Sequence, residues 1–537
     1  MTLPKSYLDR AKQSGPLIVL VLLIAAFLWT GSIGLDFGLH WDEALAFEEV
    51  TRPLETGVFL PRSYNYASML FDIGTVALLP TTIPFLIKTG KEATPLYSQK
   101  YSEIVSESKV APLVNYAKSK AFHLRFRWIL VVISSLTGLW VFLAVRACQR
   151  SGWEAVFATA VILTSWEIAY HSRWVAPDAL QMQFGALWLV LFALALNSPT
   201  RPLTWLRFSA AAAGLAAGTK YQGGFLFVPV IAFAVITIRS SGGQSRTIVR
   251  EIFLNTVIFS LVFLMTTPGF ILEPLAFWQS VRHIGHQYST GHYGYTVNAF
   301  GQHGYLLFCY LSCVLGSPWL LPAAGIFLMA VLGLGVMWKE RPMAAILLMS
   351  APLLYGSFAI SFRVMMVRNY LLLAPFIAFF SARGAYCIWK NLVTVWLRSA
   401  FLVCLIGIFA ANTLFLWIAA RTIIPQKSQR ARDVVEYLTN HPNERFYLSR
   451  VMAEFLTNQN VTLSNTTENP NKADRFLFHS DEADRTKFIC NRPFQYRLVS
   501  GRLEVNFNYY ADWEGQGKVF DVSMKRANEM HLFPQEY

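Results

Sequence analysis

Residues 16–35 read PLIVLVLLIAAFLWTGSIGL, and residues 36–44 continue as DFGLHWDEA. The first stretch has no charged residue and is long enough to cross a bilayer as a helix. The second begins where the first ends, so its acidic pair, Asp42 and Glu43 behind Trp41, lies close to the membrane face. Carboxylates in such a place are either solvated in an interfacial loop or used by an active site. The rest of the chain decides between these two interpretations.

The composition predicts a polytopic helical membrane protein. Of 537 residues, 54% are hydrophobic and only 15% are charged, whereas soluble domains carry about 25% charged residues. The net charge of +14 lies largely in short basic connections between apolar runs, where orientation in the membrane explains it, so we expect no nucleic-acid partner. The six cysteines form no disulfide framework, because only Cys490 lies in the polar tail.

Hydropathy predicts about eleven membrane spans and a first external loop over residues 36–127. The expected spans are residues 16–35, 128–145, 153–170, 177–196, 203–218, 223–238, 252–267, 317–338, 343–360, 370–389 and 400–420. Within the loop, residues 67–87 are apolar but are interrupted by Asp72, Pro80 and Pro84. We therefore expect interfacial or re-entrant helices there, and not a further span.

Charge places the two sides of the membrane. Lys5, Arg10 and Lys12 precede the first span, which puts the N-terminus in the cytoplasm. Alternate connections are basic, as the bias toward positive cytoplasmic loops requires: Arg146 with Arg150, Arg201 with Arg207, Arg239 with Arg246 and Arg250, Lys339 with Arg341, and Lys390 with Arg398. An odd number of spans then sends the C-terminus outside, and Asp42 is also outside.

The chain changes character after Arg421. A helical pattern over residues 430–441 precedes short alternating runs that are typical of strands. The expected strands are residues 445–448, 461–463, 476–478, 496–499, 503–507 and 519–522. We therefore divide the chain into a transmembrane module, residues 1–420, and a small external α/β domain, residues 421–537.

Three external connections carry basic residues against the charge bias. Arg173, Lys220 and Arg368, the last with Arg363 nearby, each lie beside a span end on the side of Asp42. A long basic side chain can reach the lipid phosphates from such a position. Three groups on the face that also carries Asp42, Asp178 and Glu273 are better explained by an anionic ligand, and a phosphate suits basic side chains near helix ends.

The external loop after the seventh span is rich in histidine and aromatic residues. Residues 267–304 contain Glu273, Arg282, His283, His286, His292 and His303, with Trp278, Tyr288, Tyr293 and Tyr295. The histidines could bind a metal, but their spacing matches no zinc pattern. The favoured interpretations are that these side chains stack on a sugar and hydrogen-bond to it, or that they only pack the loop. The predicted sugar or acceptor ligands are Trp41, Tyr64, Glu273, His286, His292 and Tyr293.

Together these motifs resemble the GT-C superfamily of polyprenyl-phosphate-sugar-dependent glycosyltransferases, in the branch with protein O-mannosyltransferases and the lipid A aminoarabinose transferase. The resemblance covers about residues 10–420. It is carried by Trp41-Asp42-Glu43, Arg173-x-x-x-Pro177-Asp178-Ala179-Leu180, Thr219-Lys220-x-x-Gly223, and Arg368-Asn369-Tyr370 with Pro375. Lys220-Tyr221-Gln222 departs from the family's commoner Lys-Gly-Pro. Residues 91–120 and the C-terminal domain match no part of the family pattern.

The resemblance implies an external catalytic cavity, a base in the first external loop, and basic residues that bind the carrier phosphate. Asp42 is then the predicted base, with Asp178 and Glu43 positioning the acceptor or the sugar, and Lys220, Arg173 and Arg368 binding the phosphate. From the residues alone, Asp42 and Asp178 are equally good bases. A phosphate already leaves well, so the reaction needs a base and cations but no general acid. No cofactor is required, although a divalent cation at Asp42 and Asp178 stays open.

The predicted function is inverting transfer of a sugar from a polyprenyl-phosphate carrier to an acceptor hydroxyl at the external face. The alternative is a polytopic transporter or a lipid-linked-sugar flippase, since charges in the membrane also mark substrate paths. Against it, the charges gather at one face and no halves repeat. A glycan, a lipid and a protein all remain open as acceptor. The resemblance favours a bacterial inner membrane.

Overall fold

The computed structural model describes residues 5–36, 41–61, 63–89, 111–149, 151–291, 296–448, 466–467, 474–479, 496–499, 502–505 and 519–523. In this part of the chain, nine helical segments are long and apolar enough to cross a membrane. They are residues Ser14–Ser32 of α1 (Lys5–Ser32), α6 (Lys120–Gln149), α9 (Pro177–Asn197), η2 with α11 (Tyr221–Leu226 and Phe227–Ser240), α12 (Ser245–Thr266), α16 (Leu320–Glu340), α17 (Pro342–Ile360), η3 with α18 (Val367–Leu373 and Ala374–Asn391), and residues Val395–Arg421 of α19 (Val395–Asn440). The predicted polytopic helical class is confirmed.

Two of the eleven expected spans are not among these nine segments. Residues 153–170 form two helices, α7 (Gly152–Leu163) and α8 (Trp166–His171), because the chain leaves the helix at Thr164 and Ser165. The Ser165 hydroxyl accepts a hydrogen bond from the Ile168 N–H at 3.5 Å and so caps α8. The other, α10 (Pro202–Ala217), is a 16-residue helix.

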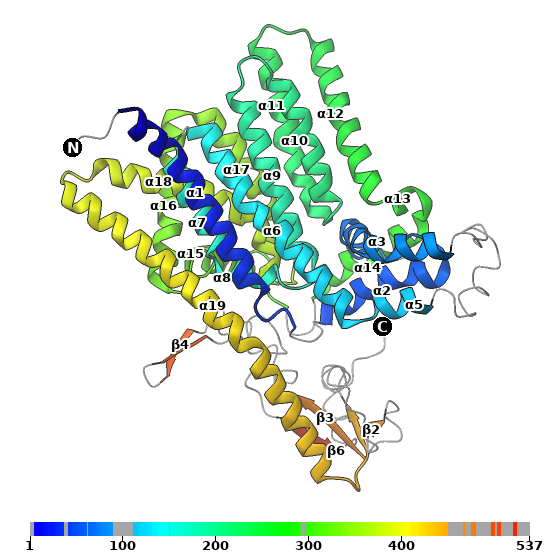
Figure 1. Cartoon of the computed structure of the whole chain (residues 1–537). Helices are drawn as coiled ribbons and strands as arrows, with labels where there is room; N and C mark the ends of the chain where they lie inside the picture. The colour runs from blue at the N-terminus through cyan, green and yellow to red at the C-terminus, as the bar shows by residue number, and fades with distance from the viewer. Residues whose placement is uncertain are drawn as a thin grey trace.

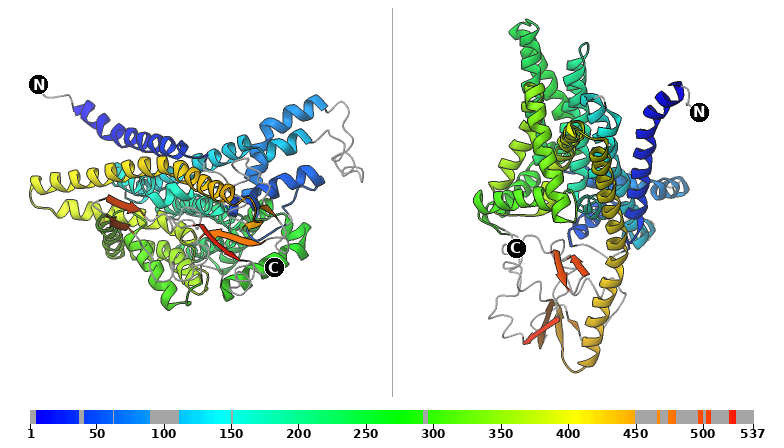
Figure 2. Two further views of the ribbon diagram at one scale, coloured as in Figure 1. Left: turned by 90° about the horizontal axis from the view of Figure 1, so that it is seen from below. Right: turned by 90° about the vertical axis from the view of Figure 1, so that its left-hand side faces the viewer.

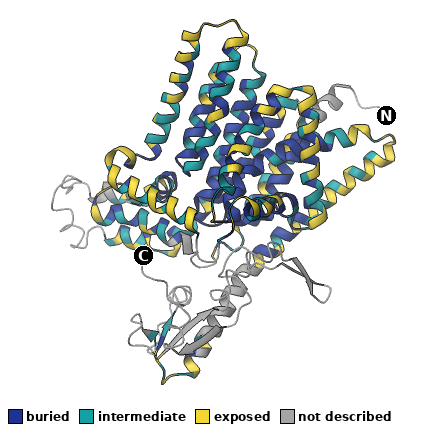
Figure 3. Cartoon of the chain, turned by 180° about the vertical axis from the view of Figure 1, so that it is seen from behind, coloured by how far each residue is buried: buried dark blue, intermediate teal, exposed yellow. Residues whose placement is uncertain are grey.

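Small residues let the central helices pack closely. A Cβ built on Gly333 of α16 would lie 1.9 Å from the Phe380 carbonyl oxygen, and one on Gly384 of α18 would lie 1.9 Å from the Met329 carbonyl oxygen. Close backbone approach at small residues is the usual basis of helix packing in membranes. Figure 3 shows the resulting buried centre and exposed outer helices. The apolar window of α9 is 72% buried, whereas that of α12 is only 11% buried and suits contact with lipid.

The first loop forms helices that lie across the ends of the long ones (Figure 1). These are α2 (Trp41–Thr56), α3 (Met69–Thr89) and α5 (Ala111–Ala117). Residues 67–87, expected to be interfacial or re-entrant, coincide largely with α3. Its start is fixed by hydrogen bonds from the Met69 N–H to the Gly218 carbonyl, at 2.9 Å, and from the Ser68 N–H to the Thr267 hydroxyl, at 3.3 Å.

After α12 the chain forms α13 (Gly269–Leu272), α14 (Pro274–Thr290) and α15 (Gly301–Cys313). The segment between α14 and α15 joins the segment before η3. Thr296 and Val364 form an antiparallel bridge, and the Val297 N–H donates to the Arg363 carbonyl at 2.7 Å. The loop after α12 is thus bonded to the segment that carries Arg368.

The second half of the last helix and the tail strands extend away from the other helices (Figures 1 and 2). The segments expected as a span, residues 400–420, and as a separate helix, residues 430–441, are one continuous helix, α19. Beyond it lie β1 (Phe446–Leu448), β2 (Thr466–Thr467), β3 (Arg475–His479), β4 (Tyr496–Val499), β5 (Arg502–Val505) and β6 (Val519–Ser523). One sheet has the order β2-β1-β3-β6, and β4 pairs with β5. The strand expected at 461–463 lies outside the described residues, and the domain boundary stays a prediction.

Candidate active site

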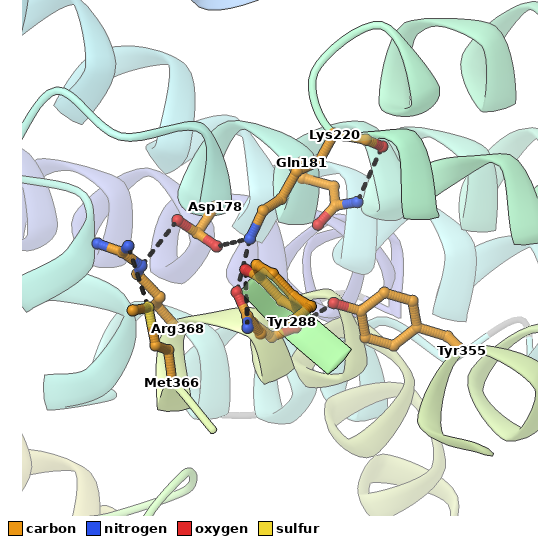
Figure 4. Close-up of polar contacts among 8 residues, drawn as sticks. Asp178, Gln181, Lys220, Tyr288, Tyr355, Met366 and Arg368 are labelled. Atoms are coloured by element: carbon orange, nitrogen blue, oxygen red, sulfur yellow. Dashed lines mark hydrogen bonds and ion pairs between the residues drawn. The ribbon is translucent and has the colours of Figure 1, made fainter. Parts of the chain in front are cut away.

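Three segments that are far apart in the sequence bring Asp178, Lys220 and Arg368 together (Figure 4). Asp178 lies in the first turn of α9, which Pro177 opens. Lys220 is an extended residue directly before η2, and Arg368 lies at the start of η3. Each side chain is therefore placed at the beginning of a helical segment, where the backbone leaves an extended conformation.

The contacts among these residues are short and buried. The Lys220 ammonium donates to Asp178 Oδ1 at 2.6 Å and to Asn369 Oδ1 at 2.6 Å. Arg368 Nε lies 3.5 Å from Asp178 Oδ2. We call Asp178, Lys220, Arg368 and Asn369 the Asp178 cluster; none of the four is more than 9% exposed. Buried charges of this kind are stable only when they are paired.

Neighbouring side chains hold the Asp178 cluster in place. The Gln181 amide donates to the Lys220 carbonyl at 3.3 Å, and the Tyr355 hydroxyl donates to the Asn369 carbonyl. The Asn369 amide nitrogen lies 3.5 Å from the Tyr288 hydroxyl of α14. Lys220 Nζ also lies 5.6 Å from the centre of the Tyr66 ring. The cluster is thus surrounded by residues of the first loop, α9, α14 and α17.

The electrostatics favour an anionic ligand. Burial is the largest single influence and opposes the charged form of Lys220, but the carboxylate of Asp178 together with Tyr288 and Tyr355 outweighs it and holds the pKa of Lys220 above its ordinary value. Lys220 therefore stays a cation at neutral pH. Burial also raises the pKa of the Tyr66 phenol, so this neighbour stays neutral. Two cations and one carboxylate leave the three charged members of the cluster with a net charge of one positive.

Arg173 makes different contacts from those expected. Its guanidinium donates to the Thr30 carbonyl at 2.7 Å, the Ile33 carbonyl at 2.8 Å and the Ala169 carbonyl at 3.3 Å. Carbonyls at the end of a helix such as α1 lack partners within it. Arg173 thus caps α1, and none of these bonds connects it to the Asp178 cluster. Its expected role as a phosphate ligand gains no support from them.

Glu43 is a packing residue in the structure. Its carboxylate pairs with the Arg127 guanidinium, with Nε at 2.9 Å from Oε1, and also accepts from the Val175 N–H at 2.7 Å. Arg127 in turn donates to the Leu35 carbonyl at 2.6 Å. Because Glu43 is fully buried in these bonds, it fixes the start of α2 and does not present its carboxylate as a ligand. Its expected role with the sugar or acceptor gains no support from these bonds.

Of the remaining predicted ligands, Tyr64 and Glu273 meet. The Tyr64 hydroxyl donates to Glu273 Oε2 at 2.8 Å, and the Tyr221 hydroxyl donates to the Tyr64 carbonyl at 2.7 Å. Burial, with the bond to Glu273, raises the pKa of Tyr64. His286 is exposed on α14. The side chains of Trp41 and Asp42, and residues His292 and Tyr293, lie outside the described residues.

Sequence reasoning missed Asn369, Tyr66, Tyr288, Tyr355 and Glu49. Asn369 stands beside Arg368 in a quoted motif, so a polar residue at a helix start was the available signal. Glu49 lies on α2. Burial raises its pKa to about 8, although a hydrogen bond with the Ser63 side chain lowers it. Tyr288 was noted only as one aromatic residue of the loop after the seventh span, while Tyr66 and Tyr355 gave no signal, because aromatic residues at membrane interfaces are common.

No group of three or more His, Cys, Asp and Glu residues that could hold a metal occurs within the described part of the chain. A divalent cation would need carboxylate oxygens. Of the two carboxylates considered for it, Asp178 bonds to Lys220, while the side chain of Asp42 is not described. A cation at this pair therefore stays an untested prediction.

Comparison with known proteins gives one family match and several solved structures of similar fold. Residues 118–268 match the family model described as dolichyl-phosphate-mannose-protein mannosyltransferase. The match runs from α6 to the end of α12 and includes Asp178 and Lys220. No curated protein matches the chain in sequence. The class that the helical fold and this match define is that of a membrane glycosyltransferase.

Solved structures show the same fold. The oligosaccharyltransferase AglB from Archaeoglobus fulgidus, solved with an inhibitory peptide and a dolichol-phosphate, has a TM-score of 0.51 at 11% identity over 86% of this chain. An Archaeoglobus fulgidus oligosaccharyltransferase in the apo form has a TM-score of 0.50 at 10% identity over 83% of this chain. This chain covers only 65% and 63% of those two chains. ArnT from Cupriavidus metallidurans, solved with undecaprenyl phosphate, has a TM-score of 0.48 at 13% identity. The match covers 87% of this chain and 94% of the ArnT chain. The predicted resemblance to the GT-C superfamily is confirmed.

Proposed function

We propose that this protein transfers a sugar from a polyprenyl-phosphate carrier to an acceptor hydroxyl at the external face of the membrane. The observation that carries the proposal is the Asp178 cluster, in which two buried cations meet at the starts of helices. Helix starts also present free N–H groups and a partial positive charge. Together these features suit a phosphate that leaves a sugar.

The contacts of the Lys220 ammonium support a proposed role in binding the phosphate. Of its three N–H groups, one bonds to Asp178 and one to Asn369. The third is available to a phosphate oxygen, and a charged phosphate can also displace the neutral amide of Asn369. Arg368 adds a second cation beside the same carboxylate. As the bond to the sugar breaks, these charges stabilise the negative charge that grows on the phosphate.

We propose separate roles for Asp178 and Asp42. Asp178 bonds to Lys220 and lies against Arg368, so it serves to hold the two cations. Asp42, in the first turn of α2, is the proposed base that takes the proton of the acceptor hydroxyl. Attack by the acceptor from the side opposite the phosphate would invert the anomeric carbon. Phosphate leaves without a general acid because its second pKa is near 6.

The comparisons support the choice of donor and acceptor class. The matching family is described as using dolichyl-phosphate mannose with protein, and AglB, which shares the fold, was solved with dolichol-phosphate. We propose a polyprenyl-phosphate sugar as donor and a glycan, lipid or protein as acceptor. We further propose a cytoplasmic N-terminus, an external C-terminus and a bacterial inner membrane, because the charge alternation requires the first two and the resemblance favours the third.

Turnover of a labelled donor tests the proposal. Purified full-length protein is incubated with sugar-labelled polyprenyl phosphates and candidate acceptors, and both the free lipid phosphate and the mass of the product are measured. We expect release of lipid phosphate together with a glycosylated acceptor, and loss of both in Asp42→Asn. Movement of intact donor across vesicles without release of lipid phosphate would instead identify a flippase.

A further inference from the structure

Helix α14 has an inner face that contacts the site residues. Phe277 is 4% exposed and lies 5.6 Å from the Tyr64 ring and 5.8 Å from the Tyr221 ring, measured between centroids. The hydroxyl of Tyr288 lies 3.5 Å from the Asn369 amide nitrogen. The carbonyl of Tyr288 accepts from the Arg363 N–H at 2.9 Å. These bonds fix the helix and its rotation about its own axis.

The opposite side of α14 faces away from the protein. Its exposed residues recur at intervals of three and four, which places them along one side of a helix. We call this set the outer stripe: Leu275, Trp278, Gln279, Arg282, His283 and His286. Leu275 is 79% exposed and Trp278 is 53% exposed, so the apolar end of the stripe is not covered by protein.

The apolar end continues a surface that suits lipid. On α12, which is long and apolar enough to cross the membrane, Phe253 is 65% exposed and Met265 is 79% exposed. On α13, Ile271 and Leu272 are 60% and 65% exposed. Figure 1 shows α13 at the end of α12, with α14 following. Exposed apolar residues therefore run from a membrane span through α13 to Leu275 and Trp278.

The other end of the outer stripe is basic. Arg282, His283 and His286 follow the apolar residues, and α14 contains no aspartate or glutamate. Within the described part of the chain, no ion pair involves Arg282. The stripe therefore changes from apolar to basic as it leaves the span. That order matches the change from acyl chains to phosphates at a membrane surface, where tryptophan is also enriched.

We propose that the outer stripe is a binding site for the head groups of anionic phospholipids. Leu275 and Trp278 lie at the border of the acyl chains, while Arg282, His283 and His286 bind the lipid phosphate. Arginine binds phosphate oxygens through paired N–H groups, and anionic lipids attract basic residues near the surface. A soluble protein partner fits less well, because the apolar part of the stripe joins the lipid-facing surface instead of ending in a polar rim.

Site-specific photocrosslinking tests the proposal in the full-length protein. Gln279, in the middle of the stripe, is replaced by benzoylphenylalanine, and the protein is placed in nanodiscs of equal phosphatidylcholine and phosphatidylglycerol. Mass spectrometry then identifies the lipid adducts. We expect phosphatidylglycerol to exceed phosphatidylcholine by about fivefold, on the order of one basic residue's attraction. The combined variant Arg282→Gln, His283→Gln, His286→Gln should bring the ratio to that of the bulk lipid.

A matched position separates this site from general lipid contact. Leu328 on α16 is 64% exposed, so benzoylphenylalanine there should form adducts in the bulk ratio, with or without the combined variant. If the combined variant does not fold, Arg282→Gln alone should still lower the phosphatidylglycerol ratio. Absence of lipid adducts at position 279, or a bulk ratio there in the otherwise unchanged protein, overturns the proposal. The measurement needs no donor and no turnover, so it is independent of the proposed transferase activity.

Discussion

The side chain of Lys220 connects the start of α9 to the start of η3 through one ammonium group. The arrangement keeps the lysine extended and charged inside the protein. A lysine that only reached toward lipid phosphates would not need two short acceptors within the fold.

Replacing Lys220 should therefore affect turnover. A charge-assisted hydrogen bond is worth about 1.5–3 kcal/mol, so we expect Lys220→Gln to lower kcat/KM by about tenfold or more. If the ammonium acts mainly on the leaving phosphate, the loss appears in kcat. Purified variants with a short-chain donor provide the measurement, and thermal unfolding checks the fold. The control is Arg250→Gln, in a connection expected on the opposite side of the membrane. An equal loss of kcat/KM in both variants would mean that Lys220 only helps to orient the protein in the membrane.

For Arg173 we expect a loss of stability instead. Arg173→Gln removes the guanidinium donor from the carbonyls of Thr30 and Ile33, and losing such partners costs about 1–3 kcal/mol. The Tm should fall, while KM for the donor in the folded fraction should stay within about threefold of its original value. A variant with unchanged Tm and a large increase in KM would restore Arg173 as a phosphate ligand.

The sequence predicted Asp178, Lys220 and Arg368 for the site and also predicted Arg173, on the same argument. All four are charged residues beside span ends, and three of them meet. Arg173 differs only through its partner, the end of α1, about 140 residues earlier in the chain. Tertiary partners at this separation leave no local pattern, so charge position could identify the candidates but could not separate a ligand from a helix cap.

At the level of elements, α2 carries both the proposed base and the bonds that fix it. The ion pair of Glu43 with Arg127 is fully buried, so removal of one partner leaves an uncompensated charge. We expect Glu43→Gln or Arg127→Gln to cost about 3–5 kcal/mol. The double variant Glu43→Gln, Arg127→Gln should cost less than the sum of the two single changes, since neither charge remains. Denaturant unfolding in detergent measures the cycle, and strict additivity would contradict a coupled pair.

The same helix predicts a dependence of stability on pH. The pKa of Glu49 is about 8 in the folded protein, above its ordinary value of 4.5. As pH rises between these values, the unfolded chain loses the proton and the folded chain keeps it, so the free energy of unfolding falls. Glu49→Gln has no proton to lose. Its Tm advantage over the original protein should therefore be larger near pH 8 than near pH 5. Glu48→Gln, on the exposed side of α2, is the matched control.

Hydropathy predicted the long helices well and their interruptions poorly. Residues 177–196 and 343–360 coincide closely with α9 and α17. The break at Thr164 and Ser165 could not be read from an apolar run, because it depends on partners elsewhere: Ser165 donates to the Leu315 carbonyl at 2.7 Å, and Asn412 donates to Thr164 at 3.4 Å. The continuity of α19 was missed because its polar second half resembled a separate helix.

For the molecule as a whole, the topology makes a direct prediction. If residues 67–87 do not cross the membrane, the chain near Lys100 lies outside with the Asp178 cluster. A cysteine placed there should react with an impermeant reagent in intact cells, because the charge alternation puts the whole first loop outside. A cysteine near Arg246, in a basic connection, serves as the protected control. Labelling of position 246 but not position 100 would reverse the topology and place the site in the cytoplasm.

The continuous helix α19 has a mechanical consequence. Its apolar part ends at Arg421 and the helix ends at Asn440, so about 28 Å of helix extends beyond the apolar span, at ~1.5 Å per residue. A flexible linker of the same length would let its ends approach and separate over a wide range. A helix instead acts as a stiff spacer. It sets both the distance of the following segment from the membrane and the rotation of that segment about the helix axis. The strand β1, which begins at Phe446 shortly after the helix ends, would be kept at a nearly constant distance from the membrane surface.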